Sequence, residues 1–388
     1  MFLNRDLHYT NKYNLNTKLQ DVVIIGGGLA GLVSAIGLAN KGLSVVVVEK
    51  KSYPLHRVCG EYVSNEVLPF LQGLGADVSV LQPARINRFM LSSPKGATLE
   101  AKLDLGGFGI SRYTLDHFLF QLAQARGTTF KLNTAVQKIS FEDDLFTVTL
   151  SDGSDIRAAV VLGAYGKRSN LDRQLQRPFF TSRSPYLGVK YHLKYDFRKD
   201  TIALHNFRDG YAGISAVEND RYCFCYLTTR QNLRQHTSIP AMERAILYQN
   251  PFLRQIFEEA EFLYEQPEVI NEISFATKNC VENHMLMCGD AAGMITPLCG
   301  NGMAMAIHAG KIATEHVLHY FENGRNRQLL EQNYTHAWKK QFEQRLTLGR
   351  TVQHLFGSPV LSEMAVGVLR HVPAAVQLLM RQTHGQPF

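Results

Sequence analysis

The chain has 388 residues, of which 45% are hydrophobic and 19% charged, so it can bury a sizeable core and global disorder is excluded. Lys and Arg number 41 against 34 Asp and Glu, a net charge of +7, but no basic run or nucleic-acid-binding motif accompanies it, so no nucleic acid is expected as a partner. None of the six cysteines forms a C-x-x-C pair or completes a zinc site, so no metal is expected.

Residues 1–20 are polar and mixed, which predicts a loose N-terminal arm without the apolar core of a secretory signal. The longest apolar runs, at Val22–Ile25 and Val45–Val48, have the length of buried strands and are too short to span a bilayer. The sparse cysteines fit a reducing compartment, so a cytoplasmic protein is expected.

Residues 21–49 show the pattern of a strand, a glycine-rich turn, a helix and a second strand. The strands, Val22–Ile25 and Ser44–Glu49, are apolar and β-branched, as in a parallel sheet covered on both faces. The helix is predicted over Leu29–Asn40 and ends before Gly42.

The turn carries the dinucleotide-binding spacing Gly26-x-Gly28-x-x-Gly31. Gly26 permits the tight turn, Gly28 lets the backbone approach a pyrophosphate, and Gly31 lets the helix pack on the sheet. The helix N-terminus then offers free N–H groups to phosphates, and Ala30 lies at the same place. We therefore predict that these residues bind a dinucleotide.

Glu49 ends the second strand and Lys50 follows it, and both are predicted to reach the same ligand. A carboxylate 23 residues after Gly26 can accept hydrogen bonds from ribose hydroxyls and would repel a 2′-phosphate. NADP in this slot is therefore disfavoured.

Further elements follow in chain order from their apolar spacing. Helices are predicted at Leu68–Leu74, Thr114–Gln124 and Pro240–Tyr248, and strands within Arg85–Leu105 and at Phe130–Leu132, Phe146–Leu150, Val160–Leu162, Gly188–Leu193, Ala212–Val217 and Tyr222–Thr228. The pattern changes between Pro185 and about Ser274, which indicates a second domain inserted within the first.

A second glycine-rich loop, Gly289-Asp290-Ala291-Ala292-Gly293, follows the predicted strand Met285–Cys288. It continues through Pro297 and Gly300-Asn301-Gly302-Met303 into a helix predicted to reach about His319. An Asp here can hold a polyol hydroxyl, and the glycines let the helix direct its N-terminus at an electron-rich ring edge. Because an NAD dehydrogenase does not need this loop, the two loops together predict FAD.

The two loops resemble those of the flavoprotein aromatic hydroxylase and geranylgeranyl reductase superfamily, which has the glutathione-reductase type of FAD fold. Residues 54–64 are similar to the P-x-x-x-x-C-G-x-x-x-S stretch of geranylgeranyl reductase relatives. Ser111-Arg112-x-x-Leu115-Asp116 is similar to a helix start whose Arg lies near the flavin, and Thr134-Ala135-Val136 to a segment that meets the adenine. FAD is predicted to bind non-covalently. The resemblance adds Cys59, Arg112 and Val136 to its predicted contacts. Arg57 is predicted to hold a phosphate of the cofactor or a substrate carboxylate, and a solvated surface position stays open for it.

Three departures from the family pattern bear on the reaction. Tyr165 replaces the Asp of the hydroxylases' D-G motif, which serves flavin and NADPH contacts, so NADPH or NADH stays open as the electron donor. The reductases' aromatic-rich segment is missing, and Asp209-Gly210-Tyr211 stands in its region. The halogenases' W-x-W-x-I-P is absent and Trp338 is the only Trp, which disfavours halogenation.

The resemblance implies an α/β fold with a Rossmann-like FAD-binding domain, an interleaved antiparallel-sheet substrate domain and a helical C-terminal tail. The predicted FAD-binding segments are residues 21–84, 107–170 and 275–325, the substrate domain 85–106 and 171–274, and the tail 326–388. The tail carries seven Lys or Arg and three Asp or Glu, and Val360–Leu379 is mostly apolar. Peripheral membrane contact through this tail is one interpretation, and packing over the substrate cavity or the FAD-binding domain is the favoured one.

The predicted function is that of an FAD-dependent oxidoreductase, in which the cofactor carries the chemistry and the protein holds a hydrophobic small molecule over it. The resemblance favours a monooxygenase that hydroxylates an aromatic, polyketide or isoprenoid-like substrate. A geranylgeranyl-reductase-like enzyme acting on carbon–carbon bonds of a lipid is the first alternative, and a non-catalytic redox sensor the second. Candidate residues lining the active site are Cys59, Glu61, Tyr62 and Tyr211, and a catalytic thiol is the less favoured role for Cys59.

Overall fold

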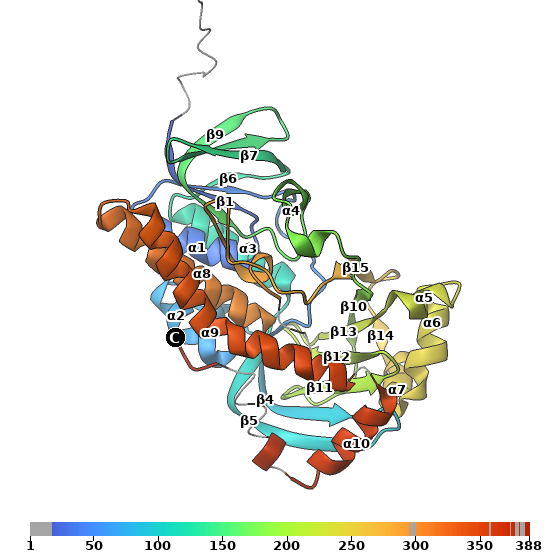
Figure 1. Cartoon of the computed structure of the whole chain (residues 1–388). Helices are drawn as coiled ribbons and strands as arrows, with labels where there is room; N and C mark the ends of the chain where they lie inside the picture. Colours follow the sequence, from blue (N-terminus) through green and yellow to red (C-terminus); the bar gives the residue numbers. More distant parts are fainter. Residues whose placement is uncertain are drawn as a thin grey trace, which may run out of the picture.

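The computed structural model describes residues 18–294, 296, 300–356, 358–372, 374–376, 380 and 385–388. Two large sheets dominate these residues, with helices packed on both (Figure 1). Within the described part of the chain, sheet A in the upper half of Figure 1 has eight strands and sheet B below it has nine. Segments of the two sheets alternate along the chain, and this confirms the mixed α/β fold with an inserted antiparallel sheet.

The core of sheet A is parallel, and its strand order is β16-β17-β9-β1-β2-β6. Its strands are β1 (Gln20–Ile25), β2 (Val45–Val48), β6 (Thr129–Lys131), β9 (Asp155–Gly163), β16 (Val281–Glu282) and β17 (Met285–Met287), and the hairpin β7 (Val136–Glu142) and β8 (Leu145–Leu150) joins it through β9. Ile25 pairs with Val48 on one side and with Gly163 on the other. The carboxyl ends of these three strands therefore meet at one edge, where α/β sheets bind ligands.

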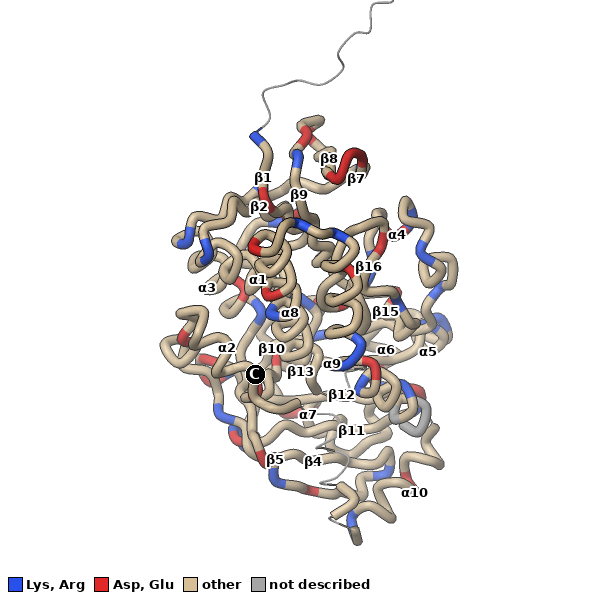
Figure 2. Tube along the Cα trace, turned by 60° about the vertical axis from the view of Figure 1, so that its left-hand side comes forward, with Lys and Arg blue, Asp and Glu red and all other residues tan. Residues whose placement is uncertain are grey.

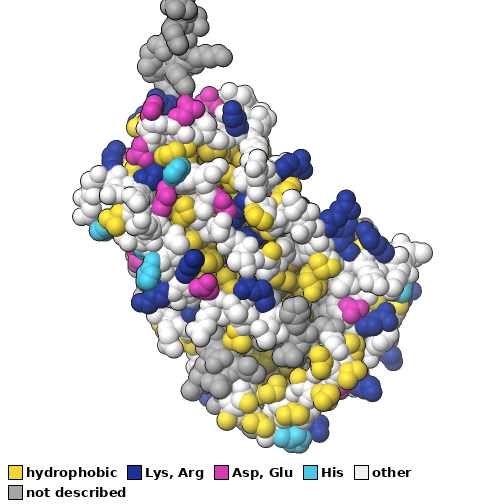
Figure 3. All heavy atoms as spheres, in the orientation of Figure 1, with side chains coloured by type: hydrophobic (Ala, Val, Ile, Leu, Met, Phe, Trp, Pro, Cys, Tyr) yellow, Lys and Arg dark blue, Asp and Glu magenta, His cyan; other side chains and the backbone are white. Residues whose placement is uncertain are grey.

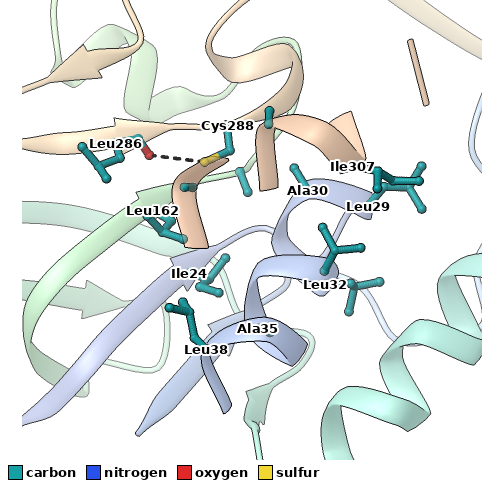
Figure 4. Close-up of a cluster of buried hydrophobic side chains, with 14 of the residues drawn as sticks. Ile24, Leu29, Ala30, Leu32, Ala35, Leu38, Leu162, Leu286, Cys288 and Ile307 are labelled. Carbon is teal, nitrogen blue, oxygen red and sulfur yellow. Dashed lines mark hydrogen bonds between the residues drawn. The ribbon is translucent and has the colours of Figure 1, made fainter. Parts of the chain in front are cut away.

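Helices α1 (Leu29–Ala39), α3 (Arg112–Ala125), α8 (Gly302–Glu322) and α9 (Arg327–Phe356) pack beside sheet A. Almost every residue of α1 is buried, because the helix lies between the sheet and α8. The Ser34 hydroxyl of α1 donates to the Gly310 carbonyl of α8 at 3.1 Å, a close approach that small residues permit. Figure 4 shows Ile24, Leu162 and Leu286 of three strands directed into the same apolar cluster as α1.

Sheet B is mostly antiparallel, with the order β14-β10-β13-β12-β11-β4-β5-β3, and β15 also pairs with β10. Its strands are β3 (Tyr62–Ser64), β4 (Ala84–Ser92), β5 (Thr98–Gly109), β10 (Tyr186–Lys194), β11 (Thr201–Phe207), β12 (Gly210–Ala216), β13 (Tyr222–Thr229), β14 (Glu261–Phe262) and β15 (Glu268–Ile273). One face is apolar and is covered by α6 (Ile239–Ile246) and α7 (Pro251–Glu259). The other face presents the alternate residues of each strand, including Lys190 and His192, to the loops that join the two sheets.

The remaining helices are short. They are α2 (Leu68–Gly73), α4 (Asn170–Gln174), α5 (Arg230–Arg234) and α10 (Pro359–Leu369), with the 3-10 turns η1 (Asn65–Val67), η2 (Val78–Leu81), η3 (Pro178–Phe180), η4 (Leu247–Gln249) and η5 (Gly289–Ala291). The C-terminus lies beside α2 in Figures 1 and 2, where the rings of Phe388 and Phe70 are 5.9 Å apart. None of the helices in the described ranges has the length and apolarity needed to cross a membrane.

Most predicted elements occur within a few residues of their predicted bounds, and the helical tail is confirmed by α9 and α10. Strand β11 was not predicted, because His205 and Asn206 interrupt its apolar pattern; both are buried and hydrogen-bonded to Ser92 of β4. Tyr62–Ser64 and Gly107–Gly109 pair with each other in sheet B, although the predicted boundaries place both in the FAD-binding segments. The predicted arm lies outside the described residues up to position 17.

Candidate functional site

The β1–α1 turn has a shape that its glycines make possible. Gly26 has a φ of +102°, and a Cβ on it would lie 2.5 Å from the carbonyl oxygen of Ala164. A Cβ on Gly31 would lie 2.1 Å from the Gly26 carbonyl oxygen. Gly28 is the N-cap of α1. A Cβ on Gly28 would have one neighbour within 4 Å, the guanidinium of Arg112 at 3.8 Å. The N-terminus of α1 is therefore open to a ligand, as a pyrophosphate requires.

Glu49 lies directly after β2 and is 4% exposed. Its carboxylate accepts the N–H of Gly27 at 2.9 Å, so it is held beside the glycine turn. Its carbonyl oxygen accepts the N–H of Thr134 at 3.1 Å, which brings the segment leading to Val136 alongside. The glycine turn and the segment before Val136 therefore both bond to Glu49. Lys50, the next residue, is exposed.

Two arginines converge on the buried carboxylate of Asp116 in α3. Arg112 donates two hydrogen bonds to it, at 2.6 and 2.7 Å, and Arg57 donates a third at 3.0 Å. Arg57 also lies 3.4 Å from Glu49. Arg57 is thus tied to the nucleotide turn instead of being solvated, and Asp116 orients both guanidinium groups.

The second glycine-rich loop contacts the first. Gly289 has a φ of +58°, and a Cβ on it would lie 3.3 Å from the Ala30 Cβ. Burial raises the pKa of the adjacent Asp290 carboxyl, while the charge of Lys278 opposes the shift. Hydroxyl donors from a ligand would stabilise the charged form of Asp290, as a polyol chain does. Pro297, the next predicted contact, lies outside the described residues.

Helix α8 begins close to the same place. Its first residue, Gly302, follows Asn301, which is fully buried, and Met303 is buried behind it. Gly300 has a φ of +63°, and a Cβ there would lie 3.7 Å from the ring of Tyr62. The start of α8 and the candidate residue Tyr62 therefore border the same space.

These features fit an FAD molecule. The open N-terminus of α1 suits its pyrophosphate, the buried Glu49 suits a ribose, and the start of α8 suits the edge of its ring. The predicted contacts at both loops would hold the cofactor in this arrangement.

Tyr165, the residue that departs from the family pattern, takes part in a buried network. Its hydroxyl donates to Asp172 at 3.0 Å, and the same carboxylate oxygen accepts from Arg177 at 3.0 Å. Arg177 is 1% exposed and also donates to the carbonyl oxygen of Ala291 at 2.9 Å and to Glu282 at 3.2 Å. The network thereby fastens the loop after β9 to η5, the second glycine-rich loop.

The face of sheet B that lies toward sheet A holds the loop of residues 57–61 by its backbone. Lys190 of β10, Ser215 of β12 and Cys223 of β13 donate to the carbonyl oxygens of residues 57, 60 and 59 at 3.1, 3.3 and 3.2 Å. Three neighbouring strands therefore position the loop that carries Cys59.

Glu61 ends this loop and is fully buried, with a φ of +55°. Its carboxylate accepts the N–H of Arg112 at 2.8 Å, lies 2.6 Å from Nε2 of His192, and contacts the Lys190 ammonium. Burial acts to raise its pKa, but the hydrogen bond from His192 and the charge of Lys190 outweigh burial and lower the pKa to about 2. Glu61 is therefore an ionised residue that joins α3 to β10, and it is not a proton donor.

The ligand atoms of Glu61, His192 and Cys223 lie within 4.8 Å of one another, a donor set that Zn²⁺ accepts. The Lys190 ammonium already contacts the same carboxylate, and the Cys223 thiol donates to a backbone carbonyl. The charge of Glu61 is thus compensated within the chain, and we assign no metal to this cluster.

Cys59 has a protonated thiol. Burial raises its pKa, and the positive charge of Arg112 only partly opposes the shift. Its sulfur accepts the N–H of Glu61 at 3.5 Å. A raised pKa disfavours the thiolate that a nucleophile needs, but it leaves a proton on sulfur at neutral pH.

Apolar side chains cover the other half of the same sheet face. Tyr211 of β12 is 4% exposed and packs with Leu204 and Leu227, while Tyr62 packs with Ile202. Ser215, which holds the Cys59 loop, lies four residues after Tyr211 on the same strand, or about 13 Å along it. The polar and apolar halves are therefore neighbours on one surface.

Three residues of this region, Lys190, His192 and Arg177, were not predicted from the sequence. Lys190 and His192 alternate with Val189, Tyr191 and Leu193 in a predicted strand, so a period of two would have placed both on the opposite face. Arg177 has no such local signal, because its partner Ala291 is 114 residues away.

The FAD binding domain family model matches residues 20–345 of the chain. Conditioned medium factor receptor 1 of Dictyostelium discoideum is 23% identical over 382 residues, with 90% of this chain and 74% of that protein covered. Digeranylgeranylglycerophospholipid reductase 1 of Methanopyrus kandleri is 24% identical, with 89% and 92% covered. Menaquinone reductase of Mycolicibacterium smegmatis is 30% identical, with 78% and 76% covered.

Solved structures share the fold. Flavin-dependent brominase Bmp2 superposes with a TM-score of 0.77 at 19% identity, with 94% of this chain and 93% of that chain covered. A geranylgeranyl bacteriochlorophyll reductase-like protein from Thermoplasma acidophilum gives 0.76 at 17% identity, with 94% and 96% covered. With the family model matching most of its length, the chain belongs to the FAD binding domain family and is an FAD-dependent oxidoreductase.

Proposed function

We propose that the chain reduces a carbon–carbon double bond in the isoprenoid part of a lipid or quinone. The sequence alone favours hydroxylation and places reduction second. The named relatives that act on lipids and quinones are reductases, and one of them matches 89% of the chain. The solved halogenases and monooxygenases are at most 20% identical, so their likeness supports the fold and not a reaction.

The observation that carries the proposal is the position of Cys59 on a loop that three strands of sheet B hold by its backbone, where burial raises the pKa of the thiol. Reduction of a double bond adds a hydride to one carbon and a proton to the other. Bound FAD supplies hydride chemistry. The Cys59 thiol would supply the proton, and its neighbour Glu61 keeps the loop in place.

The apolar half of sheet B suits the rest of such a substrate. Tyr211, Leu204 and Leu227 line this half with buried aromatic and aliphatic side chains, and Tyr62 borders the start of α8. The first three side chains are 6% exposed or less beneath α10, so an isoprenoid chain would contact them by taking the place of the inner side of that helix (Pro359–Leu369).

The test is anaerobic turnover of the purified protein, reduced with dithionite, with geranylgeranyl lipid and menaquinone as substrates. After air has reoxidised any quinol to the quinone, mass spectrometry is expected to show two added hydrogens that remain in the isoprenoid part of the product. A product heavier by one oxygen atom, formed only after air is admitted, would establish hydroxylation instead.

Replacement of Cys59 by Ala is expected to lower kcat at least about tenfold, because a positioned proton donor contributes that much or more. FAD content is measured alongside kcat, because Cys59 is also a predicted contact of the cofactor. Cys225→Ala is the matched control, because that thiol lies on the same sheet face and holds no part of the loop. Equal kcat for the two variants would show that Cys59 is not the proton donor.

A further inference from the structure

Helix α10 is apolar on two sides. Its inner side packs on sheet B, where Val366 is fully buried in the same cluster as Leu204, Tyr211 and Leu227. Its outer side exposes a set of large apolar side chains, here called the outer stripe: Val360, Leu361, Met364 and Val368, which are 67, 45, 62 and 63% exposed. Val372, just after the helix, is 44% exposed.

The outer stripe forms one continuous surface. At about 100° per residue, its four helical positions fall within an arc of about 100°. Figure 3 shows hydrophobic side chains gathered along the lower right edge of the molecule, over α10. A helix on the surface of a protein in water presents polar residues on its outer side, so the outer stripe requires a cover.

The charges around the outer stripe indicate what kind of surface binds it. Lys95 and Arg370 are exposed beside it, and Arg370 donates to Nε2 of His371 at 3.0 Å. The acidic residue of α10, Glu363, is half-buried and accepts the N–H of Lys95 at 2.6 Å, so it lies against the protein. The surface thus combines apolar side chains with flanking positive charge, which matches an anionic bilayer.

We propose that the outer stripe of α10 docks on an anionic lipid bilayer, with the helix lying in the plane of the membrane surface. The inner side of the helix covers the apolar half of sheet B, so docking brings that half within one helix diameter, about 10 Å, of the lipid. The proposal goes beyond the function proposed above, since it concerns where the protein acts; vesicle binding is measured without turnover, so either can fail alone.

The experiment is flotation of the full-length holoprotein with vesicles of phosphatidylcholine and phosphatidylglycerol in equal parts, and with vesicles of phosphatidylcholine alone. Strong binding is expected to the anionic vesicles and to weaken as salt rises. Met364→Glu and Val368→Glu are each expected to reduce binding at least about tenfold, because each moves a charge into the interface. Val80→Glu is the matched control, because Val80 is 65% exposed on η2.

The flavin absorbance and melting temperature of each variant show whether it has folded. Loss of vesicle binding in the two α10 variants, with retention in Val80→Glu, supports the proposal. It is overturned if the wild-type protein does not bind either vesicle, or if all three variants bind equally. It is also overturned if the protein is a dimer in solution that Met364→Glu converts to monomers without any vesicle binding, because the outer stripe would then meet a second copy.

Discussion

At the scale of single residues, the site depends on charges that are buried and paired. Glu61, Lys190 and His192 lie at the contact between α3 and sheet B, where none of them reaches solvent. Such a cluster is costly to desolvate and is retained only when its partners are well placed. Its geometry indicates a positioning role: it holds the loop that carries Cys59 against the sheet.

The stability of the protein should therefore depend on Glu61. Its folded pKa, about 2, is below the ordinary value of 4.5, so its contribution is fully present above pH 4.5 and is lost as pH falls toward 2. Glu61→Gln is expected to lower the free energy of unfolding at pH 7 by about 3 kcal/mol, because it leaves Lys190 buried and unpaired. Urea denaturation at several pH values measures this, and the difference from wild type should shrink below pH 4.5.

Two further variants test the cause. Glu61→Gln combined with Lys190→Met should be more stable than Glu61→Gln alone, since both charges are then gone. Glu261→Gln, which breaks the exposed pair with Lys194, should change stability little. Equal effects of the two Glu→Gln changes would show that the buried pair is not a special contributor.

At the scale of elements, the second glycine-rich loop depends on α4 and the residues after it. Arg177 connects Asp172 of α4 with the backbone of η5, and Tyr165 reaches the same carboxylate. The Tyr at this position therefore has a structural use where the hydroxylases have Asp. The position of the second glycine-rich loop thus depends on the hydrogen bonds of Tyr165, Asp172 and Arg177 as well as on its own glycines.

Arg177→Met is expected to weaken FAD binding at least about tenfold, because it removes the donor to the Ala291 carbonyl and leaves Asp172 and Glu282 without their cation. Titration of the apoprotein with FAD, followed by flavin fluorescence, measures the dissociation constant. Arg183→Met is the control, since Arg183 is exposed. Unchanged affinity in Arg177→Met would mean that η5 keeps its shape without the network.

At the scale of the whole molecule, the parts predicted from the sequence are those with local signals. The G-x-G-x-x-G turn, Glu49 and the start of α8 each carry their chemistry within a few adjacent residues, and the structure brings these segments together. What the sequence could not predict is contact between distant segments. Lys190 meets Glu61 across 129 residues, and no short pattern encodes that distance.

The C-terminal tail shows the same limit. Its sequence indicates an apolar helix, but either side could face the protein. The structure decides this by burying Val366 on sheet B and leaving Met364 and Val368 exposed. Packing on the protein occupies the inner side of α10, and the proposed membrane contact would use only its outer side.

The flavin spectrum under anaerobic conditions tests the central claim most directly. The purified protein should be yellow from bound FAD, should bleach on reduction with dithionite, and should regain its oxidised spectrum when an isoprenoid lipid without a quinone ring is added in the absence of oxygen. Replacing dithionite with NADPH or with NADH in the reduction of the flavin identifies the electron donor. A reduced flavin that only oxygen can reoxidise would contradict the proposed reduction, and a colourless protein that cannot be reconstituted with FAD would contradict the site itself.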